Sequence, residues 1–117
     1  MAISTIKQTG SVYIVESGKN GIWNYHKYSD GRYHAWLVGS INLGAGTAWA
    51  GGYFHQSTST LTPPSFSTRV DSFEGKTNAG VLAICCGYGN GYASYWFNGN
   101  APAINGLAVR LDMYGTW

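Results

Sequence analysis

Aromatic side chains and amides gather in the glycine-rich parts of this chain, most densely at residues 88–100 (YGNGYASYWFNGN). Sugars present apolar C–H faces beside many hydroxyls, so aromatic platforms flanked by polar groups suit carbohydrate binding. We therefore predict a glycan-binding site in these segments. The candidate ligand-binding residues are Tyr88, Asn90, Tyr92, Tyr53 and Trp49.

Residues 88–100 also fit a plainer interpretation, an aromatic core interrupted by turns. Trp96 and Phe97 are expected in that core. Tyr88, Asn90 and Tyr92 lie beside turn glycines, where loops often carry function. Both interpretations stay open at the level of the sequence.

Three histidines, His26, His34 and His55, could in principle bind a metal ion. Zinc sites take three or four protein ligands, and no Cys, Asp or Glu follows these histidines at ligand spacing. We predict no metal and no cofactor. The histidines are expected to be polar aromatics on a sheet surface or at an interface.

The chain has five acidic residues, Glu16, Asp30, Asp71, Glu74 and Asp112. A glycoside hydrolase needs two facing carboxylates. The spacing of the five acidic residues in this sequence does not indicate such a pair. No Gly-x-Ser-x-Gly elbow is present, and the glycines of residues 87–91 lack the Gly-Lys-Ser/Thr ending of a phosphate loop. We predict that the chain is not an enzyme. A small polysaccharide hydrolase is the second alternative.

The composition is typical of β structure. The 117 residues suit one domain and include 17 Gly, nine Tyr and five Trp. Only 10% are charged, against about 25% in ordinary domains, which suits a surface covered by sister subunits. The net charge is +2, and the seven Lys and Arg residues are scattered along the chain, so no nucleic-acid partner is expected. No apolar stretch is long enough to insert into a membrane as a helix.

Short alternating runs, broken by Gly or Pro, predict strands and no helix. The fold class expected is all-β, an antiparallel β-sandwich of jelly-roll-like type with about eight strands. Gly51 and Gly52 suggest a bend or bulge. Residues 1–117 form a single domain in this interpretation, with residues 1–10 as a linker or stalk connection. The expected strands are residues 11–17, 22–28, 32–40, 47–56, 65–73, 79–87, 91–97 and 106–114.

The last of these strands shows strict alternation, which implies one buried face. Arg110 and Asp112 share the opposite face, where we expect cross-strand or intersubunit ion partners. The predicted buried face consists of Leu107, Val109, Leu111 and Met113.

Asp30-Gly31, between two aromatic runs, predicts a hairpin. A two-residue turn would place Tyr25 opposite Trp36. A three-residue turn with a bulge at Gly31 would instead place His26 opposite His34. One residue of slip changes which side chains share a face, and the sequence leaves both registers open.

Residues 25–36 (YHKYSDGRYHAW) resemble the R-K-W-S-D-G-x-x-E-x-W signature. That signature occurs in C-terminal domains of phage and prophage minor tail, tail-fibre and baseplate proteins. The ending, residues 107–117, is also similar, with an alternating strand followed by Gly and Trp. Tyr28, His26 and His34 depart from the usual residues. The matching residues are Lys27, Ser29, Asp30, Gly31 and Trp36.

The resemblance implies a β-sandwich head, usually trimeric, at the distal end of a tail appendage. It places the protein in the virion, after synthesis in the cytoplasm of a bacterial host, with other tail proteins and a host surface glycan as partners. Ser29, Asp30, Gly31 and Trp36 are then a structural hairpin motif and carry over no catalytic residue. The alternative is a free-standing lectin or adhesin module that binds carbohydrate.

Overall fold

The computed structural model describes residues 11–58, 60–77, 82–88 and 91–117, with the backbone alone for 82–88. The described residues form strands, turns and loops and contain no helix. The predicted all-β, antiparallel fold class is confirmed. The strands are β1 (Ile14–Asn20), β2 (Trp23–Tyr28), β3 (Arg32–Leu43), β4 (Thr47–Trp49), β5 (Gly52–Gln56), β6 (Arg69–Lys76), β7 (Leu82–Tyr88), β8 (Gly91–Asn98) and β9 (Ile104–Thr116).

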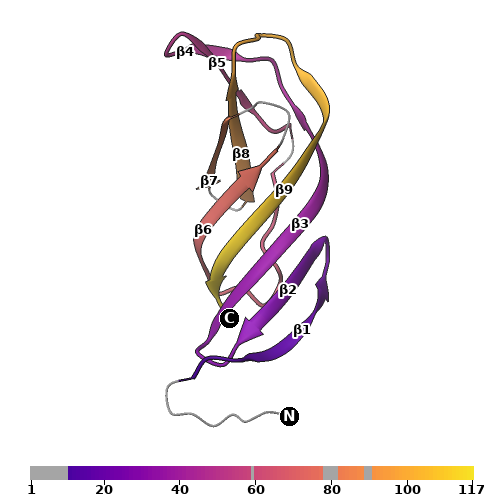
Figure 1. Cartoon of the computed structure of the whole chain (residues 1–117), viewed down its shortest axis with the longest axis vertical. Coiled ribbons are helices and arrows are strands. Elements are labelled where there is room, and N and C mark those ends of the chain that lie inside the picture. Colours follow the sequence, from indigo (N-terminus) through magenta and orange to yellow (C-terminus); the bar gives the residue numbers. More distant parts are fainter. Residues whose placement is uncertain (1–10, 59, 78–81, 89–90) are drawn as a thin grey trace.

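Two antiparallel sheets make up the structure (Figure 1). The five-stranded sheet has the order β1-β2-β3-β9-β6, and the four-stranded sheet has the order β4-β5-β8-β7. The chain passes from one sheet to the other after β3, β5, β6 and β8. The molecule extends 53 × 27 × 23 Å. The β4–β5 hairpin lies at one end of the long axis and the start of the described chain at the other (Figure 1).

One predicted strand, residues 47–56, is two strands joined by a tight turn. Ala50 and Gly51 have φ angles of 50° and 81°, and positive φ at both central residues is the geometry of a two-residue hairpin turn. Trp49 is therefore paired with Gly52. The expected bend or bulge at Gly51 and Gly52 is a complete chain reversal.

Other predicted strands also differ from the observed ones at their ends; β3 continues to Leu43, and β9 spans Ile104–Thr116. β1 runs to Asn20 instead of ending at residue 17, because its pairing with β2 continues through residues that show no apolar alternation. β6 begins at Arg69, since the residues before it form a turn in which Ser67 N donates to Pro64 O at 2.9 Å. Of the predicted strand 79–87, residues 79–81 lie outside the described residues.

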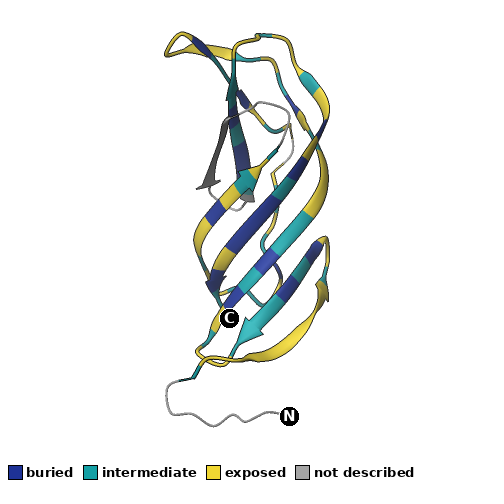
Figure 2. Ribbon diagram, in the orientation of Figure 1, coloured by how far each residue is buried: buried dark blue, intermediate teal, exposed yellow. Residues whose placement is uncertain are grey.

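The core lies between the sheets along β9 (Figure 2). The predicted buried face of β9 is confirmed, since all four of its apolar side chains are at most 6% exposed. Trp96 of β8 is fully buried against this face. A Cβ at Gly75 of β6 would lie 2.8 Å from Leu111 and 3.0 Å from Trp96. Glycine at this position is therefore what lets the indole reach the five-stranded sheet.

Residues 60–68 cover the part of the inner face of the five-stranded sheet that the described strands of the second sheet leave open. Phe66 packs against Tyr25 and Tyr33, with ring centroids 4.7 and 5.2 Å apart. Trp23 Nε1 donates to a carbonyl oxygen of this loop at 2.8 Å. The loop thus extends the hydrophobic core beyond the four-stranded sheet.

The β2–β3 hairpin adopts the three-residue turn with a bulge. His26 pairs with His34 and Asn24 with Trp36. Gly31 N donates to Tyr28 O at 3.0 Å, and Gly31 has a φ of 88°. This is a type I turn followed by a left-handed residue, the usual form of a three-residue hairpin. The second of the two predicted registers is therefore the one the chain adopts.

Replacement of Gly31 by alanine should lower the free energy of unfolding by about 1 kcal/mol, because a Cβ disfavours positive φ. Urea denaturation would measure the change. Gly99→Ala is the matched control, since a Cβ there meets nothing within 4 Å and the backbone is not left-handed. Equal effects of the two substitutions would contradict the strained turn.

Candidate functional site

The β4–β5 hairpin presents two of the predicted ligand-binding residues at one end of the molecule. Trp49 is 56% exposed, which is unusual for so large an apolar side chain. A shallow hollow of about 430 Å³ is lined by residues 48–53 and includes both Trp49 and Tyr53. This is the most exposed cluster among the predicted site residues that the structure describes.

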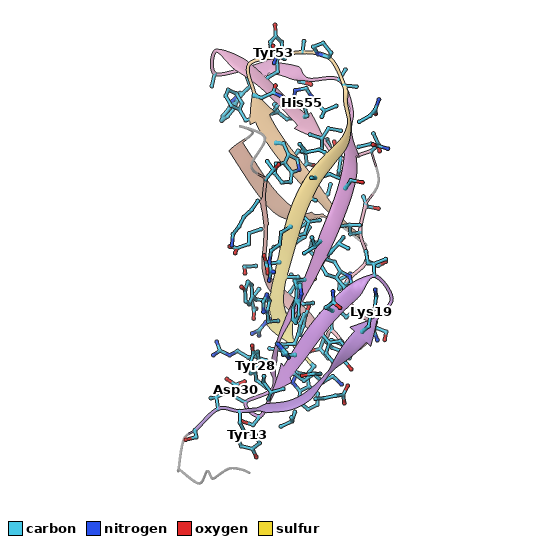
Figure 3. The ribbon with its side chains drawn as sticks, turned by 45° about the vertical axis from the view of Figure 1, so that its right-hand side comes forward. Tyr13, Lys19, Tyr28, Asp30, Tyr53 and His55 are labelled. Carbon is cyan, nitrogen blue, oxygen red and sulfur yellow. The ribbon has the colours of Figure 1, made fainter. Side chains whose placement is uncertain are left out.

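Trp49 and Tyr53 do not form one platform. Trp49 pairs with Gly52, and Tyr53 pairs with Ala48. Because paired residues share a face and neighbours alternate, the two aromatic side chains lie on opposite faces of the hairpin. Figure 3 shows Tyr53 at the extreme end of the molecule.

Trp49 belongs to a row of aromatic residues on the outer face of the four-stranded sheet, the face turned away from β9. Its ring meets that of Phe97 edge to face at 5.8 Å and 85°. Phe97 pairs with Phe54, whose ring lies 6.4 Å from that of Tyr95. We call Trp49, Phe54, Tyr95 and Phe97 the aromatic row.

Phe97 was expected in the core with Trp96, and the structure separates the two. Trp96 points inward and is fully buried, whereas Phe97, the next residue of the strand, is only partly buried. A Cβ at Gly52 would clash with Phe97 Cζ. The glycine therefore lets the Phe97 ring lie across β5 and contact Trp49.

His55 anchors the base of the hairpin (Figure 3). It is fully buried, and its Nδ1 lies 2.8 Å from Gly44 O. Its Nε2 lies 2.8 Å from Asn100 O and 3.1 Å from Asn98 Oδ1. One imidazole thus joins β5 to the segments before β4 and after β8. Such buried hydrogen bonds hold the hairpin in a fixed orientation.

The remaining predicted ligand-binding residues do not join Trp49. Tyr92 is partly buried, and its ring meets Phe73 of the core at 5.9 Å. It lies six residues from Asn98, the partner of Tyr53, or about 20 Å along the strand. The side chain of Tyr88 and all of Asn90 lie outside the described residues.

The outer face of the five-stranded sheet carries a cluster that the ligand-binding prediction did not include. The His26 and His34 rings lie 4.9 and 5.0 Å from that of Trp36. His34 also stacks on Tyr114, at 4.5 Å and 5°. We call His26, His34, Trp36 and Tyr114 the histidine ledge. The hairpin register that creates it could not be chosen from the sequence.

Asp112 is the most buried charged residue beside this ledge, at 2% exposure. Arg110 Nε and Nη2 donate to its carboxylate at 3.0–3.2 Å, and His34 Nε2 lies 2.7 Å from Oδ1. Burial raises the pKa of Asp112, but hydrogen bonds from Arg110 and His34 outweigh burial and leave the pKa below its usual value. Arg110 and Asp112 pair with each other within one strand. The expected cross-strand partner exists for Asp112 alone, in His34 of β3.

The other residues of the hairpin motif stabilise its turn. Asp30 accepts hydrogen bonds from Arg32 N at 3.1 Å and Arg32 Nε at 3.0 Å. Ser29 exchanges hydrogen bonds with the backbone of Tyr13, at 2.8 and 3.1 Å. These contacts tie the turn to the segment that leads into β1.

No three or more His, Cys, Asp or Glu side chains come together as a possible metal site in the described part of the chain. Most of the acids there are engaged by cations: Glu16 by Lys27, Asp30 by Arg32, Asp71 by Arg69 and Asp112 by Arg110. Such pairing is typical of structural ion pairs. Among the described residues there is also no helix that could cross a membrane.

The chain matches no protein-family model, and comparison with curated proteins and with solved structures found no similar protein. The likeness of the hairpin to phage tail proteins therefore stands on its motif alone. Any functional conclusion has to come from the geometry of the surface.

Ala50→Asn should raise the free energy of unfolding by about 0.5–1 kcal/mol. Ala50 adopts a φ of 50°, and asparagine tolerates this conformation better than alanine. Thermal and urea denaturation would measure the gain, with Ala48→Asn in the neighbouring strand as the control. A loss of stability in Ala50→Asn would contradict the turn.

Asp112→Asn should lower the free energy of unfolding by about 2 kcal/mol at pH 7, because hydrogen bonds to a charged carboxylate are lost. The folded-state pKa of Asp112 is depressed, so its contribution is present above the unfolded-state value of about 3.9. It is lost as the pH falls through the folded-state pKa. Urea denaturation at pH 7, 5 and 3 should therefore show the two proteins converging. The exposed pair of Asp71 and Arg69 supplies the control, Asp71→Asn, with a smaller effect.

Proposed function

We propose that this chain is a phage tail or baseplate domain that binds a glycan on the surface of a bacterial host through the β4–β5 hairpin. The observation that carries the proposal is the position and exposure of Trp49. This side chain is 56% exposed. Trp49 ends β4, and the β4–β5 hairpin lies at the end of the molecule farthest from the start of the described chain (Figure 1). An exposed, rigidly held indole at a tip is placed to meet a surface.

The chemistry of the hairpin suits a sugar. The Trp49 ring stands edge to face with Phe97, and the aromatic row continues inward from it. The C–H face of a pyranose packs on such rings, while its hydroxyls bond to backbone groups of the turn. The adjoining hollow is shallow, which favours weak binding to one sugar residue. Several linked copies would multiply the apparent affinity without new contacts.

The opposite end of the molecule carries an exposed apolar strip that suits self-association, which in this proposal gives a homotrimer. Val12, Tyr13, Ile14 and Val15 are 52%, 62%, 48% and 46% exposed. Val12 and Tyr13 precede β1, and Ile14 and Val15 are its first residues; β1 is an edge strand of the five-stranded sheet. Exposed apolar edges of this kind are sites of pairing with other chains. Association through this end would leave the three β4–β5 hairpins free.

Trp49→Ala should weaken binding to a responsive bacterial polysaccharide about tenfold, equivalent to about 1.4 kcal/mol, because a central aromatic anchor is removed. A glycan array followed by titration calorimetry would measure the change. Trp117→Ala, which removes a tryptophan that is 42% exposed and distant from the hairpin, should bind normally.

Light scattering on the same samples separates the alternatives. A trimer that binds glycan agrees with the tail-domain proposal, and a monomer that binds glycan agrees with a free-standing lectin. A trimer that is silent on every glycan would contradict the adhesive function and leave a structural knob.

A further inference from the structure

A second candidate binding surface lies on the outer face of the five-stranded sheet. A hollow of about 440 Å³ lies between β3, β6 and β9 and has an apolar floor with cations beside it. Pockets for small ligands usually occupy about 300–1,000 Å³. We call this the basic hollow. Its lining consists of Val38, Gly39, Lys76, Thr77, Ala108, Val109 and Arg110.

The floor of the basic hollow is apolar and open. Val38 is 67% exposed, the largest exposed fraction among the large hydrophobic residues that the structure describes. Ala108 is also exposed, and Gly39 presents no side chain. The histidine ledge adjoins this floor through Trp36, which precedes Val38 by two residues on the same face of β3. A ring with C–H groups could therefore rest on Val38 and reach the edge of the indole.

Two cations flank the floor. Lys76 pairs with Arg110 across β6 and β9, so both side chains stand on the same face of the sheet. Arg110 uses Nε and Nη2 to bind Asp112, and its guanidinium carbon lies 5.8 Å from the centre of the Trp36 ring. Its Nη1 makes no hydrogen bond to the described residues. Lys76 has no ion-pair partner in the part of the chain that the structure describes.

The carboxylates of this face do not cancel these charges within the hollow. Asp112 is buried beneath Arg110 and His34, and Glu74 stands opposite Asp112. Neither acid belongs to the lining, whereas both cations do. The hollow is therefore complementary to an anion that also has an apolar face.

We infer that the basic hollow binds an acidic sugar residue, one that carries a carboxylate or a phosphate. The pyranose ring rests on Val38 and Ala108, and its acidic group lies between Arg110 Nη1 and Lys76 Nζ. A sugar fits better than an acidic peptide, because the backbone of β9 is already paired on both sides. A peptide that paired with the outer edge of β6 would lie beyond Lys76, on the side away from Val38. The inference goes beyond the proposed function, since it concerns another face and a charged ligand.

The test is a titration of the ¹⁵N-labelled chain followed by NMR, with tetragalacturonate and its neutral methyl ester as probes. The acidic oligomer should shift the amides of residues 38–39, 76–77 and 108–110, and the ester should shift them far less. Lys76→Gln should weaken binding of tetragalacturonate about three- to fivefold. Lys19→Gln makes the same charge change on another exposed residue of the sheet and should have no effect.

Val38→Asp is a second variant, which places a carboxylate on the floor and should abolish binding of the acidic oligomer. Both Lys76 and Val38 are exposed, so neither substitution removes core packing. Equal shifts with the ester, or equally tight binding of an oligoglutamate peptide in the hollow, would overturn the inference. Shifts confined to residues 48–53, or the absence of any shift, would overturn it, whereas the proposed function is decided by the glycan array and the Trp49→Ala variant.

Discussion

The contact between Trp96 and β6 joins the two sheets. The indole of Trp96 is fully buried because Gly75 leaves room for it beside Leu111. Once Trp96 points inward, alternation along β8 turns Phe97 outward, and Phe97 in turn supports Trp49 at the tip. The same packing fixes the inner face of β9, so that Asp112 must stand on the outer face. Both candidate binding surfaces are thus consequences of one interior contact.

Much of the fold follows from alternation in the sequence, and the turns account for most of what does not. The buried face of β9 could be predicted because strands have a period of two residues and Leu107–Met113 keeps it without a break. The register of the β2–β3 hairpin could not be predicted, because the sequence is compatible with both a two-residue and a three-residue turn at Asp30-Gly31. The division of residues 47–56 was also hidden, because Ala50 is an unfavourable residue for a left-handed turn.

The candidate sites were harder to foresee than the fold, because they depend on which strands become neighbours. The exposure of Trp49 could be expected from its glycine-flanked position, but its contact with Phe97 joins residues 48 apart in sequence. Tyr92 carried the same local signal as Trp49 and packs toward Phe73 instead. Asp112 is buried by His34, which lies 78 residues earlier in the chain. Long-range pairing of this kind leaves no short motif.

The exposed apolar run Val12–Val15, which includes the first residues of β1, makes the isolated chain prone to association. Val12–Val15 is uncharged, free of proline and rich in residues that favour extended backbone, which is the composition of segments that stack into fibrils. Glu16 follows directly and Lys19 three residues later, and both charges limit the growth of such stacks. Copies of the chain that have not associated would be prone to aggregate through Val12–Val15. Rapid capture by sister chains or by a neighbouring component would bury it and make the association specific.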